Sequence, residues 1–215
     1  MKRIIIICEG QTEQEFCRQV LQPHFNAIHI DYPTIKKSGG GIVSWSALKK
    51  QIENHLIEEK SVIVTTFIDY YGIQDRFAFP EWAASKKEMD KGKRMNLLET
   101  AMHLAIAPSL NHRFIPYIQL HEFEALLFND IKIFEDNLRE DDFKKTELEQ
   151  IIQQYPNPEL INDTPENTPS RRLIRLIDGY DKIIYGAGLA ESIGLEKIRA
   201  KSPRFNNWIT TLENL

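Results

Sequence analysis

Two segments of the chain are apolar or β-branched at almost every position: Arg3–Cys8 (RIIIIC) and Ser61–Asp69 (SVIVTTFID). A continuous run of this kind predicts a strand buried on both faces, as in a parallel sheet covered by helices. The segment Ile28–Ile35 predicts another strand, and Pro33 within it favours an edge or irregular position. The segment Arg113–Leu120 predicts a further strand.

Segments with helical spacing of apolar residues separate these strands. Thr12 stands three residues before Glu15, so we expect a capping box at the start of a helix that ends near Pro23. Further helical patterns cover residues 45–57, 93–107, 121–128, 170–177, 188–200 and 205–214. The alternation predicts an α/β protein with a Rossmann-like, mostly parallel central sheet flanked by helices and a helical C-terminal extension.

Segments without periodicity mark loops and an internal boundary. Residues 70–92 predict a long loop over the strand ends, where α/β proteins commonly keep functional groups. Four prolines between residues 155 and 169 predict a loop or an internal boundary. We expect residues 1–130 to form the α/β core and residues 131–215 to form a mainly helical region packed on it, together one compact domain.

Composition and charge narrow the class of protein. With 215 residues and 42% hydrophobic composition, the chain can bury a full core. The apolar run near the N-terminus is too short for a signal-peptide core or a membrane span, so we expect a cytoplasmic protein without a membrane partner. Cys8 and Cys17 have no metal-binding spacing and are expected to be buried, reduced thiols.

A net charge of -4 argues against a protein that coats nucleic acid through bulk electrostatics, but it leaves room for a local basic face. The two basic clusters are Lys86, Lys87, Lys91, Lys93 and Arg94, and Arg171, Arg172, Arg175 and Lys182. For either cluster alone, an ordinary solvated surface is the simpler interpretation.

Acidic residues follow three of the predicted strands: Glu9, then Asp69, then Glu122 and Glu124. The carboxyl ends of parallel strands face one crevice, and carboxylates gathered there repel one another unless protons or cations compensate. An oxygen ligand set without Cys or several His favours Mg²⁺ or Mn²⁺ over zinc. The sequence therefore predicts a divalent-metal site at these strand ends.

Three of the acidic residues also have a structural interpretation. Glu13 would complement the positive end of its helix, an arrangement favourable by roughly 0.3–1 kcal/mol. Glu15 is interpreted as the capping-box acid and receives no catalytic role. Asp69 alone would be a turn or capping residue, but its coincidence with Glu9 favours a site.

The segment His121–Phe128 (HEFEALLF) differs from a zinc-protease helix, which carries two histidines four residues apart. Ala125 occupies the second position, so this class is excluded. In a full helix Glu122 and Glu124 differ by about 200°, so only one of them points into the site. His121 is interpreted as a structural hydrogen-bonding residue or as a contact to phosphate or metal-bound water.

The glycine triplet Gly39–Gly41 lacks the dinucleotide-binding fingerprint. No Walker A lysine pattern occurs in the chain, so the protein is not itself a P-loop ATPase. The triplet predicts a flexible turn, with close approach to a phosphate backbone as the alternative.

Two motifs carry a resemblance to a known family. Cys8-Glu-Gly-Gln-Thr-Glu13 after the first strand and Ile68-Asp-Tyr-Tyr-Gly72 after a later one resemble the Toprim domain. From end to end the chain is similar to an uncharacterised Toprim-like family that shares EGxTE, IDYYG, PYIQLHEFEALLF, INDTPE, PSRRL and GYDK. That family is similar to the nuclease half of overcoming-lysogenization-defect (OLD) proteins, which pair Toprim with an ATPase.

The resemblance implies a Toprim-like fold and roles for individual residues. Glu9 matches the invariant Toprim acid, Glu13 the second acid four residues later, and Asp69 the first aspartate of the DxD motif. Lys182 matches a late catalytic lysine. Tyr71 replaces the second DxD aspartate, so either the site holds one ion or another acid supplies the ligand. The acids available for this are Asp75, Glu122 and Glu124.

The expected function is therefore a Mg²⁺- or Mn²⁺-dependent nuclease that hydrolyses nucleic-acid phosphodiesters, with DNA favoured over RNA as the substrate and a separate ATPase as the partner, in bacterial defence. Metal held by Glu9 and Asp69 would polarise the phosphate and lower the pKa of an attacking water, and Lys182 or Arg171 would neutralise transition-state charge. The residues expected to contact nucleic acid are Arg171, Arg172, Arg175 and His121. The alternative is a non-catalytic Toprim-like module that binds nucleic acid or protein, favoured by Tyr71 and the acidic net charge.

Overall fold

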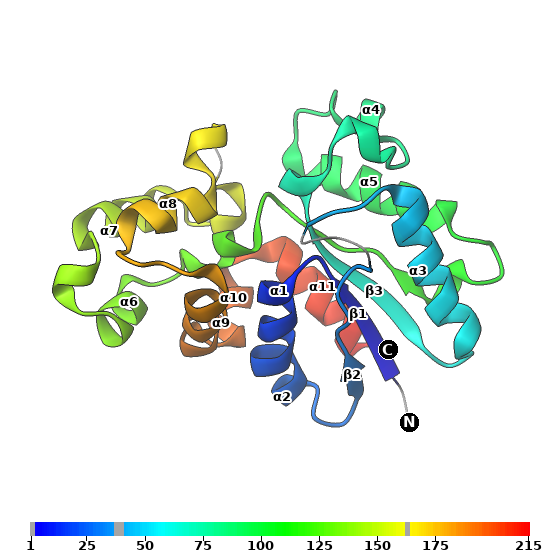
Figure 1. Cartoon of the computed structure of the whole chain (residues 1–215), viewed down its shortest axis with the longest axis horizontal. Helices are drawn as coiled ribbons and strands as arrows, with labels where there is room; N and C mark the ends of the chain where they lie inside the picture. Colours follow the sequence, from blue (N-terminus) through cyan, green and yellow to red (C-terminus); the bar gives the residue numbers. More distant parts are fainter. Residues whose placement is uncertain (1–2, 37–40, 162–163) are drawn as a thin grey trace. The chain divides into compact units, whose positions relative to one another are not determined.

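The computed structural model describes residues 3–36, 41–161 and 164–215. The chain divides into two compact units (Figure 1), and each is described by itself. Unit 1 contains residues 1–14 and 24–120, and unit 2 contains residues 15–23 and 121–215. The boundary expected near residue 130 falls within unit 2.

Unit 1 is built on a parallel sheet. β1 (Arg3–Cys8) lies between β2 (His29–Asp31) and β3 (Ile63–Asp69). On its other side β3 pairs with β4 (Phe114–Ile115) and then with β5 (Ile118–Gln119). All these pairings are parallel, so the expected Rossmann-like α/β fold is confirmed.

The register of the sheet aligns the carboxyl ends of β1 and β3. Cys8 pairs with Phe67, and the main-chain N–H of Glu9 donates to the carbonyl of Phe67 at 3.0 Å. From β1 the chain continues to β2 on one side, and from β3 it continues to β4 on the other. Open α/β sheets bind ligands where the connections diverge in this way, beyond the strand ends.

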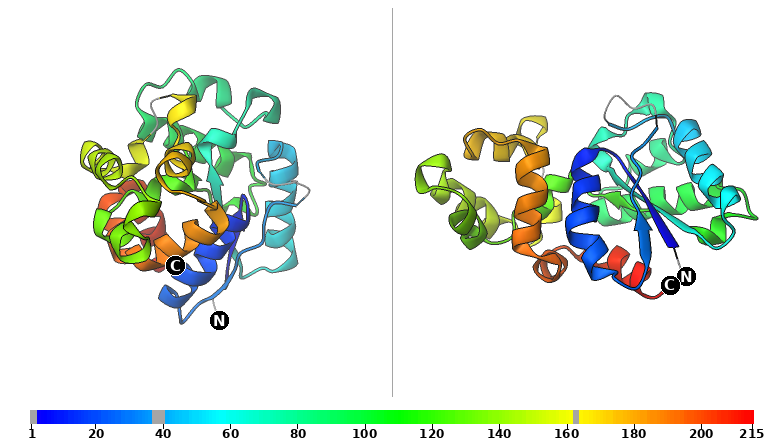
Figure 2. Two further views of the ribbon diagram at one scale, coloured as in Figure 1. Left: turned by 60° about the vertical axis from the view of Figure 1, so that its left-hand side comes forward. Right: turned by 60° about the horizontal axis from the view of Figure 1, so that its bottom comes forward.

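Two long helices cover one face of this sheet (Figure 2): α3 (Trp45–Glu58) and α5 (Lys91–Ala105). Ser44 and Asp90 begin them, because their side chains accept main-chain N–H groups of the first turn. The core between the helices and the sheet includes Ile5, Ile7, Val64 and Ile68 from the strands and Leu48, Ile52, Met95 and Leu98 from the helices. Ile4 and Ile6 are also buried, so β1 is buried on both faces, as its apolar run predicts.

Proline shapes two of the predicted strands. β2 lies at the edge of the sheet and ends before Pro33, as expected, although the main-chain N–H of Cys8 still bonds the carbonyl of Pro33 at 2.9 Å. The single strand expected over Arg113–Leu120 is wrong. Pro116 has no N–H to donate to the ladder, and it separates β4 from β5.

The helical segment after β1 begins earlier than its sequence suggests. It consists of α1 (Gln11–Phe16), a π-helical turn (Cys17–Leu21) and α2 (Gln22–His24). Glu13 reaches back to the N–H of Gly10, so the capping box expected at Thr12 and Glu15 is wrong. Glu15 instead accepts hydrogen bonds from the guanidinium of Arg18.

The segment between β3 and α5, expected as a long loop, is made of short helical turns. They are η2 (Tyr70–Gly72), η3 (Asp75–Phe77) and α4 (Trp82–Ser85). In Figure 1 this segment follows the carboxyl end of β3. A further turn, η4 (Asn111–Arg113), precedes β4.

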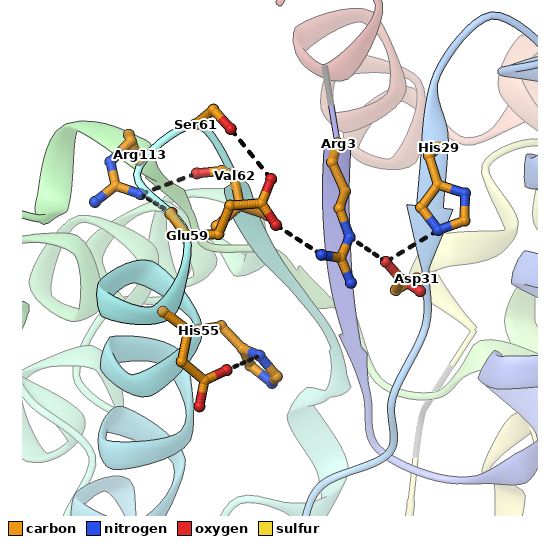
Figure 3. Close-up of polar contacts among 9 residues, drawn as sticks. Arg3, His29, Asp31, His55, Glu59, Ser61, Val62 and Arg113 are labelled. Atoms are coloured by element: carbon orange, nitrogen blue, oxygen red, sulfur yellow. Dashed lines mark hydrogen bonds and ion pairs between the residues drawn. The ribbon is translucent and has the colours of Figure 1, made fainter. Parts of the chain in front are cut away.

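Two arginines secure the amino-terminal edge of the sheet (Figure 3). Arg3 at the start of β1 donates hydrogen bonds to Asp31 at 2.5 Å and to Glu59 at 2.6 Å. The pKa of the Arg3 guanidinium is raised, chiefly by the bond to Asp31. Arg113 donates to the carbonyls of Leu56, Glu59 and Val62. The carbonyl of Leu56 lies in the last turn of α3, where carbonyl groups have no partner within the helix, and those of Glu59 and Val62 follow the helix.

Unit 2 is helical. Its elements are η5 (Phe123–Leu127), α6 (Ile131–Asn137), η6 (Glu140–Asp142), α7 (Lys145–Gln154), η7 (Pro158–Leu160), η8 (Pro165–Asn167), α8 (Pro169–Leu176), α9 (Lys182–Ile193), α10 (Leu195–Lys201) and α11 (Pro203–Glu213). Helix α6 packs against α7 and α9 (Figure 2). Phe16 packs edge-on against Phe123 and Phe205 in the core of the unit.

The α-helix expected over residues 121–128 is instead the 3₁₀ helix η5. All five of its residues are buried, so it lacks the solvent face of an amphipathic α-helix. Cys8 and Cys17 are buried and form no disulfide, as expected. Across the ranges that the structure describes, every helix is too short or too polar to cross a membrane.

Candidate functional site

The centre of the candidate site is the carboxylate of Glu9, the first residue after β1. Its Oε2 accepts a hydrogen bond of 2.9 Å from the main-chain N–H of Asp69, the last residue of β3. The pairing of Cys8 with Phe67 brings these two positions together. The predicted meeting of Glu9 and Asp69 at the strand ends is therefore present in unit 1, at the point where the sheet connections diverge.

A glycine leaves room for the Glu9 carboxylate. A Cβ atom added to Gly72 would lie 3.0 Å from Oε1 and 3.5 Å from Oε2 of Glu9, and 3.4 Å from the side chain of Ile42. Contacts near 3.0 Å are too close for a carbon and an oxygen that do not hydrogen-bond. A side chain in place of the glycine that ends the IDYYG motif would therefore crowd the acid that begins the EGxTE motif.

Glu9 and Asp69 are both partly exposed, and of the Asp69 carboxylate Oδ1 is buried. Within residues 3–36, 41–161 and 164–215, no set of three or more His, Cys, Asp or Glu side chains is arranged to hold a metal. Mg²⁺ commonly binds proteins through only one or two carboxylates and completes its shell with waters and substrate phosphates. Two carboxylates at one strand edge match that mode of binding.

Glu13 lies beside this pair in sequence but has a defined local role. Its side chain is 6% exposed, and its Oε2 accepts the N–H of Gly10 at 2.8 Å. This is the reciprocal bond of a capping box, in which an acid at the third helical position satisfies an N–H just before the helix. Glu13 therefore orders the turn that carries Glu9 into α1.

The turn after β3 is held by contacts around Tyr70. Its ring lies 5.5 Å from that of Trp82, and its hydroxyl accepts a hydrogen bond of 3.2 Å from Arg94. Asp75, an alternative metal ligand in the sequence analysis, accepts hydrogen bonds from Trp82 and Lys86. The pKa of the Asp75 carboxyl is lowered, chiefly by the bond from Lys86. Asp75 thus serves to join η3 to α4.

Tyr71 differs from its neighbour Tyr70. Its side chain is 43% exposed, and it makes no hydrogen bond or ring contact within the part of the chain that the structure describes. Because it stands between Asp69 and Gly72, it lies at the border of the acidic pair. Tyr71 is therefore an accessible aromatic ring beside the acidic pair.

The acids of the HEFE sequence belong to unit 2. Glu122 accepts the N–H of Ser170 at 2.9 Å, at the start of α8, where a carboxylate is electrostatically favourable. Glu124 is 3% exposed. His121 is buried and has a φ of 69°, a left-handed conformation that is uncommon for a residue other than glycine.

Tyr180, in the GYDK motif, lies near these acids. Burial raises the pKa of its phenol well above the ordinary range, and the negative charges of Glu124, Asp181 and Glu122 raise it further. Its hydroxyl is buried and has no hydrogen-bond partner among the described residues. Lys182, the predicted catalytic lysine, is exposed at the start of α9.

The three arginines expected to bind nucleic acid have different surroundings in unit 2. Arg172 is buried and donates to the carbonyl of Asn167 at 2.8 Å. Arg175 donates to the carbonyl of Glu166 and to the side chain of Asn167. Two of the arginines therefore hold the turn before α8, whereas Arg171 is exposed.

Of the predicted glycine triplet, Gly39 and Gly40 lie outside the described residues. Gly41 has a φ of 98°, and a Cβ atom there would lie 4.0 Å from Oε1 of Glu9. Gly41 therefore lies near the carboxylate of Glu9.

The fold and this site define an α/β protein with an acidic pair at the carboxyl edge of a parallel sheet. The chain belongs to the family described as Domain of unknown function (DUF4276), which matches residues 8–213. Comparisons with curated proteins and with solved structures gave no match. The family match spans both motifs of the candidate site.

Two residues, one in each unit, acquire a role only from the structure. In the sequence Gly72 is only the last residue of the IDYYG motif. Its close approach to Glu9 is a tertiary contact that the motif does not show. Tyr180 is likewise a letter of GYDK, and its proximity to Glu122 and Glu124 crosses more than 50 residues of sequence. The role of Gly72 has one sequence signal, which is the presence of a glycine shortly after an acid at the end of a strand.

Proposed function

We propose that this protein is a divalent-metal-dependent nuclease whose metal is held by Glu9 and Asp69. The observation that carries the proposal is the bond between the Glu9 carboxylate and the main chain of Asp69, at the ligand-binding edge of the sheet. Gly72 keeps the space beside this carboxylate open.

The chemistry of the donor set supports Mg²⁺ or Mn²⁺. Both side chains offer carboxylate oxygens, which hard divalent cations prefer. A metal bound there supplies Lewis acidity toward a phosphodiester and a water of lowered pKa. The protein's own contribution is to orient Glu9 through the N–H of Asp69 and to keep the turn after β1 ordered through Glu13.

The motifs around these acids extend the proposal. EGxTE and IDYYG resemble Toprim sequences, and the OLD-type resemblance favours action on DNA together with a separate ATPase, in defence against phage or plasmids. Lys182 and Arg171 are exposed in unit 2, and the resemblance implies that cations of this kind neutralise transition-state charge.

A second function is favoured by Tyr71 and Glu13. Tyr71 replaces an acidic ligand, and the carboxylate of Glu13 is bonded to Gly10. Both features fit a Toprim-like module that binds nucleic acid or a partner protein without cleaving it. Such a module would retain binding in EDTA and show no cleavage with any metal.

A cleavage assay separates these two functions. The purified chain is incubated with DNA and with RNA in Mg²⁺ or Mn²⁺, alone and with an ATPase encoded beside it. We expect Glu9→Gln and Asp69→Asn to lose cleavage, because each substitution removes a charged metal ligand while keeping the shape of the side chain. Equal cleavage by the wild type and both variants would contradict the proposal.

The matched control is Asp75→Asn. This acid begins η3, six residues after Asp69, and is exposed and bonded to Lys86 and Trp82. We expect cleavage by this variant to equal that of the wild type. Loss of cleavage here would assign Asp75 to the metal site and would revise the ligand set.

A further inference from the structure

Tyr71 is an exposed aromatic ring at the border of the acidic pair, and its setting indicates what approaches that pair. Asp69 stands two residues before it, and Gly72, which contacts the Glu9 carboxylate, stands one residue after it. Tyr70 is fixed by Trp82 and Arg94, so the turn that presents Tyr71 is anchored. A partly exposed aromatic ring on an anchored turn offers a face on which a base can stack.

Basic residues lie next to Trp82 and Arg94, the two residues that hold Tyr70. Trp82 begins α4, which ends just before Lys86 and Lys87, and the ammonium of Lys86 lies 5.8 Å from the centre of the Trp82 ring. Arg94, whose guanidinium bonds Tyr70, follows Lys93 in the first turn of α5. The lysine-bearing ends of α4 and α5 are thus both tied to the turn of Tyr71.

Two of these lysines are available to a ligand. Lys87 and Lys93 are exposed, and neither forms an ion pair or side-chain hydrogen bond with any described residue. Met89 between them is 89% exposed. Residues 70–94 contain six basic and four acidic side chains, although the whole chain has a net charge of -4. This segment is therefore locally basic on an acidic protein.

We propose that Tyr71, Lys87, Met89 and Lys93 form a binding face for an unpaired nucleic-acid strand, which we call the Tyr71 face. An aromatic ring can stack on a base only where that base has an open surface, and lysines beside the ring can neutralise backbone phosphates. The proposal rests on the proposed function and deepens it, because it names a single strand as the substrate class. A duplex offers phosphates to the lysines but no open base to Tyr71.

The test is fluorescence anisotropy in EDTA, with a short oligothymidylate and a duplex of the same length. The full-length wild type is expected to bind the single strand more tightly than the duplex. Tyr71→Ala should weaken binding of the single strand by about tenfold, whereas Tyr71→Phe, which retains the ring, should stay within about twofold of the wild type. Replacing both Lys87 and Lys93 by Ala should lower the slope of log affinity against log salt by about 1 to 1.5.

Matched controls lie on α3 and at its end. Ile57→Ala removes an exposed apolar side chain there, and Lys50→Ala with Lys60→Ala removes two exposed lysines. These variants should bind as the wild type does. Circular dichroism of every variant checks that the fold is retained.

Three results would overturn the Tyr71 face: affinity unchanged in Tyr71→Ala, a duplex bound as tightly as the single strand, or no binding of either. None of these decides the proposed function, which rests on metal-dependent cleavage that Glu9→Gln removes. Conversely, single-strand binding that depends on Tyr71 without any cleavage would support the Tyr71 face and contradict the nuclease.

Discussion

The side chain of Glu9 and the main chain of Asp69 are joined by a hydrogen bond of 2.9 Å, although 60 residues separate them in the sequence. This bond links the ends of two adjacent parallel strands and fixes the orientation of the Glu9 carboxylate. Gly72 limits the same carboxylate from the other direction. The position of Glu9 is therefore defined by the sheet and by the turn that follows β3.

Replacing Gly72 by alanine should disturb this arrangement. The new Cβ would lie 3.0 Å from Oε1 of Glu9, so the carboxylate must move. We expect the affinity for Mn²⁺, measured by titration calorimetry, to fall by about tenfold, a usual effect of changing a group that orients a metal ligand.

Gly188→Ala is the matched control for Gly72→Ala. Gly188 lies within α9, and a Cβ there meets nothing within 4 Å. Alanine is favoured over glycine within a helix by about 0.5–1 kcal/mol, so this variant should be at least as stable as the wild type and bind Mn²⁺ equally. Normal Mn²⁺ binding by Gly72→Ala would refute the orienting role of Gly72.

Glu13 should behave as a capping residue. Glu13→Ala removes the acceptor for the N–H of Gly10 and should lower the free energy of unfolding by about 1 kcal/mol in urea titrations. Glu13→Gln retains an acceptor oxygen and should lose less. Mn²⁺ affinity should fall less in Glu13→Gln than in Glu9→Gln. A larger loss of Mn²⁺ affinity in Glu13→Gln than in Glu9→Gln would show that Glu13 is a principal metal ligand.

Much of this site could be predicted from the sequence, because the features involved are local. The runs that form β1 and β3 are buried on both faces, and such strands are recognisable without knowledge of their partners. Parallel strands place their carboxyl ends at one edge, so the meeting of Glu9 and Asp69 followed from the two strand assignments. The start of α1 could not be predicted in the same way, because Gly10, which precedes the helix, has no side-chain oxygen of the kind that usually indicates a helix start.

Other features depend on contacts that distant segments make. Glu122 and Glu124 also follow a strand, but the chain enters unit 2 at His121, where Glu122 bonds the start of α8. Arg172 and Arg175 form a basic cluster in the sequence, yet they bond the turn that contains Asn167. Neither the partner of an acid nor that of an arginine can be read from the residue type alone.

Arg113 should contribute to stability and not to metal binding. Its guanidinium bonds the carbonyls of Leu56, Glu59 and Val62 at the amino-terminal edge of the sheet. Arg113→Ala should lower the free energy of unfolding by about 2 kcal/mol, because it leaves carbonyls without a partner. Lys60→Ala, an exposed control nearby, should change it by no more than about 0.5 kcal/mol. An unchanged stability of Arg113→Ala would show that water replaces the guanidinium at no cost.

His55 should make the stability depend on pH. Burial lowers the pKa of its imidazole, so the folded protein binds a proton less readily than the unfolded chain does. The free energy of unfolding should therefore fall as the pH drops through the unfolded-state pKa of about 6.5, and this contribution should level off below the folded-state pKa. His55→Gln should show a flatter profile in urea titrations across this range. Parallel profiles for the two proteins would contradict the assignment.

The central claim is that Glu9 and Asp69 bind a divalent cation, and titration of the purified protein with Mn²⁺ tests it most directly. The variants are Glu9→Gln, Asp69→Asn and Asp75→Asn, each first checked by circular dichroism for a retained fold. We predict that the wild type and Asp75→Asn bind Mn²⁺ with the same affinity, and that Glu9→Gln and Asp69→Asn lose this binding. Equal binding by all four proteins, or no binding by the wild type, would contradict the account.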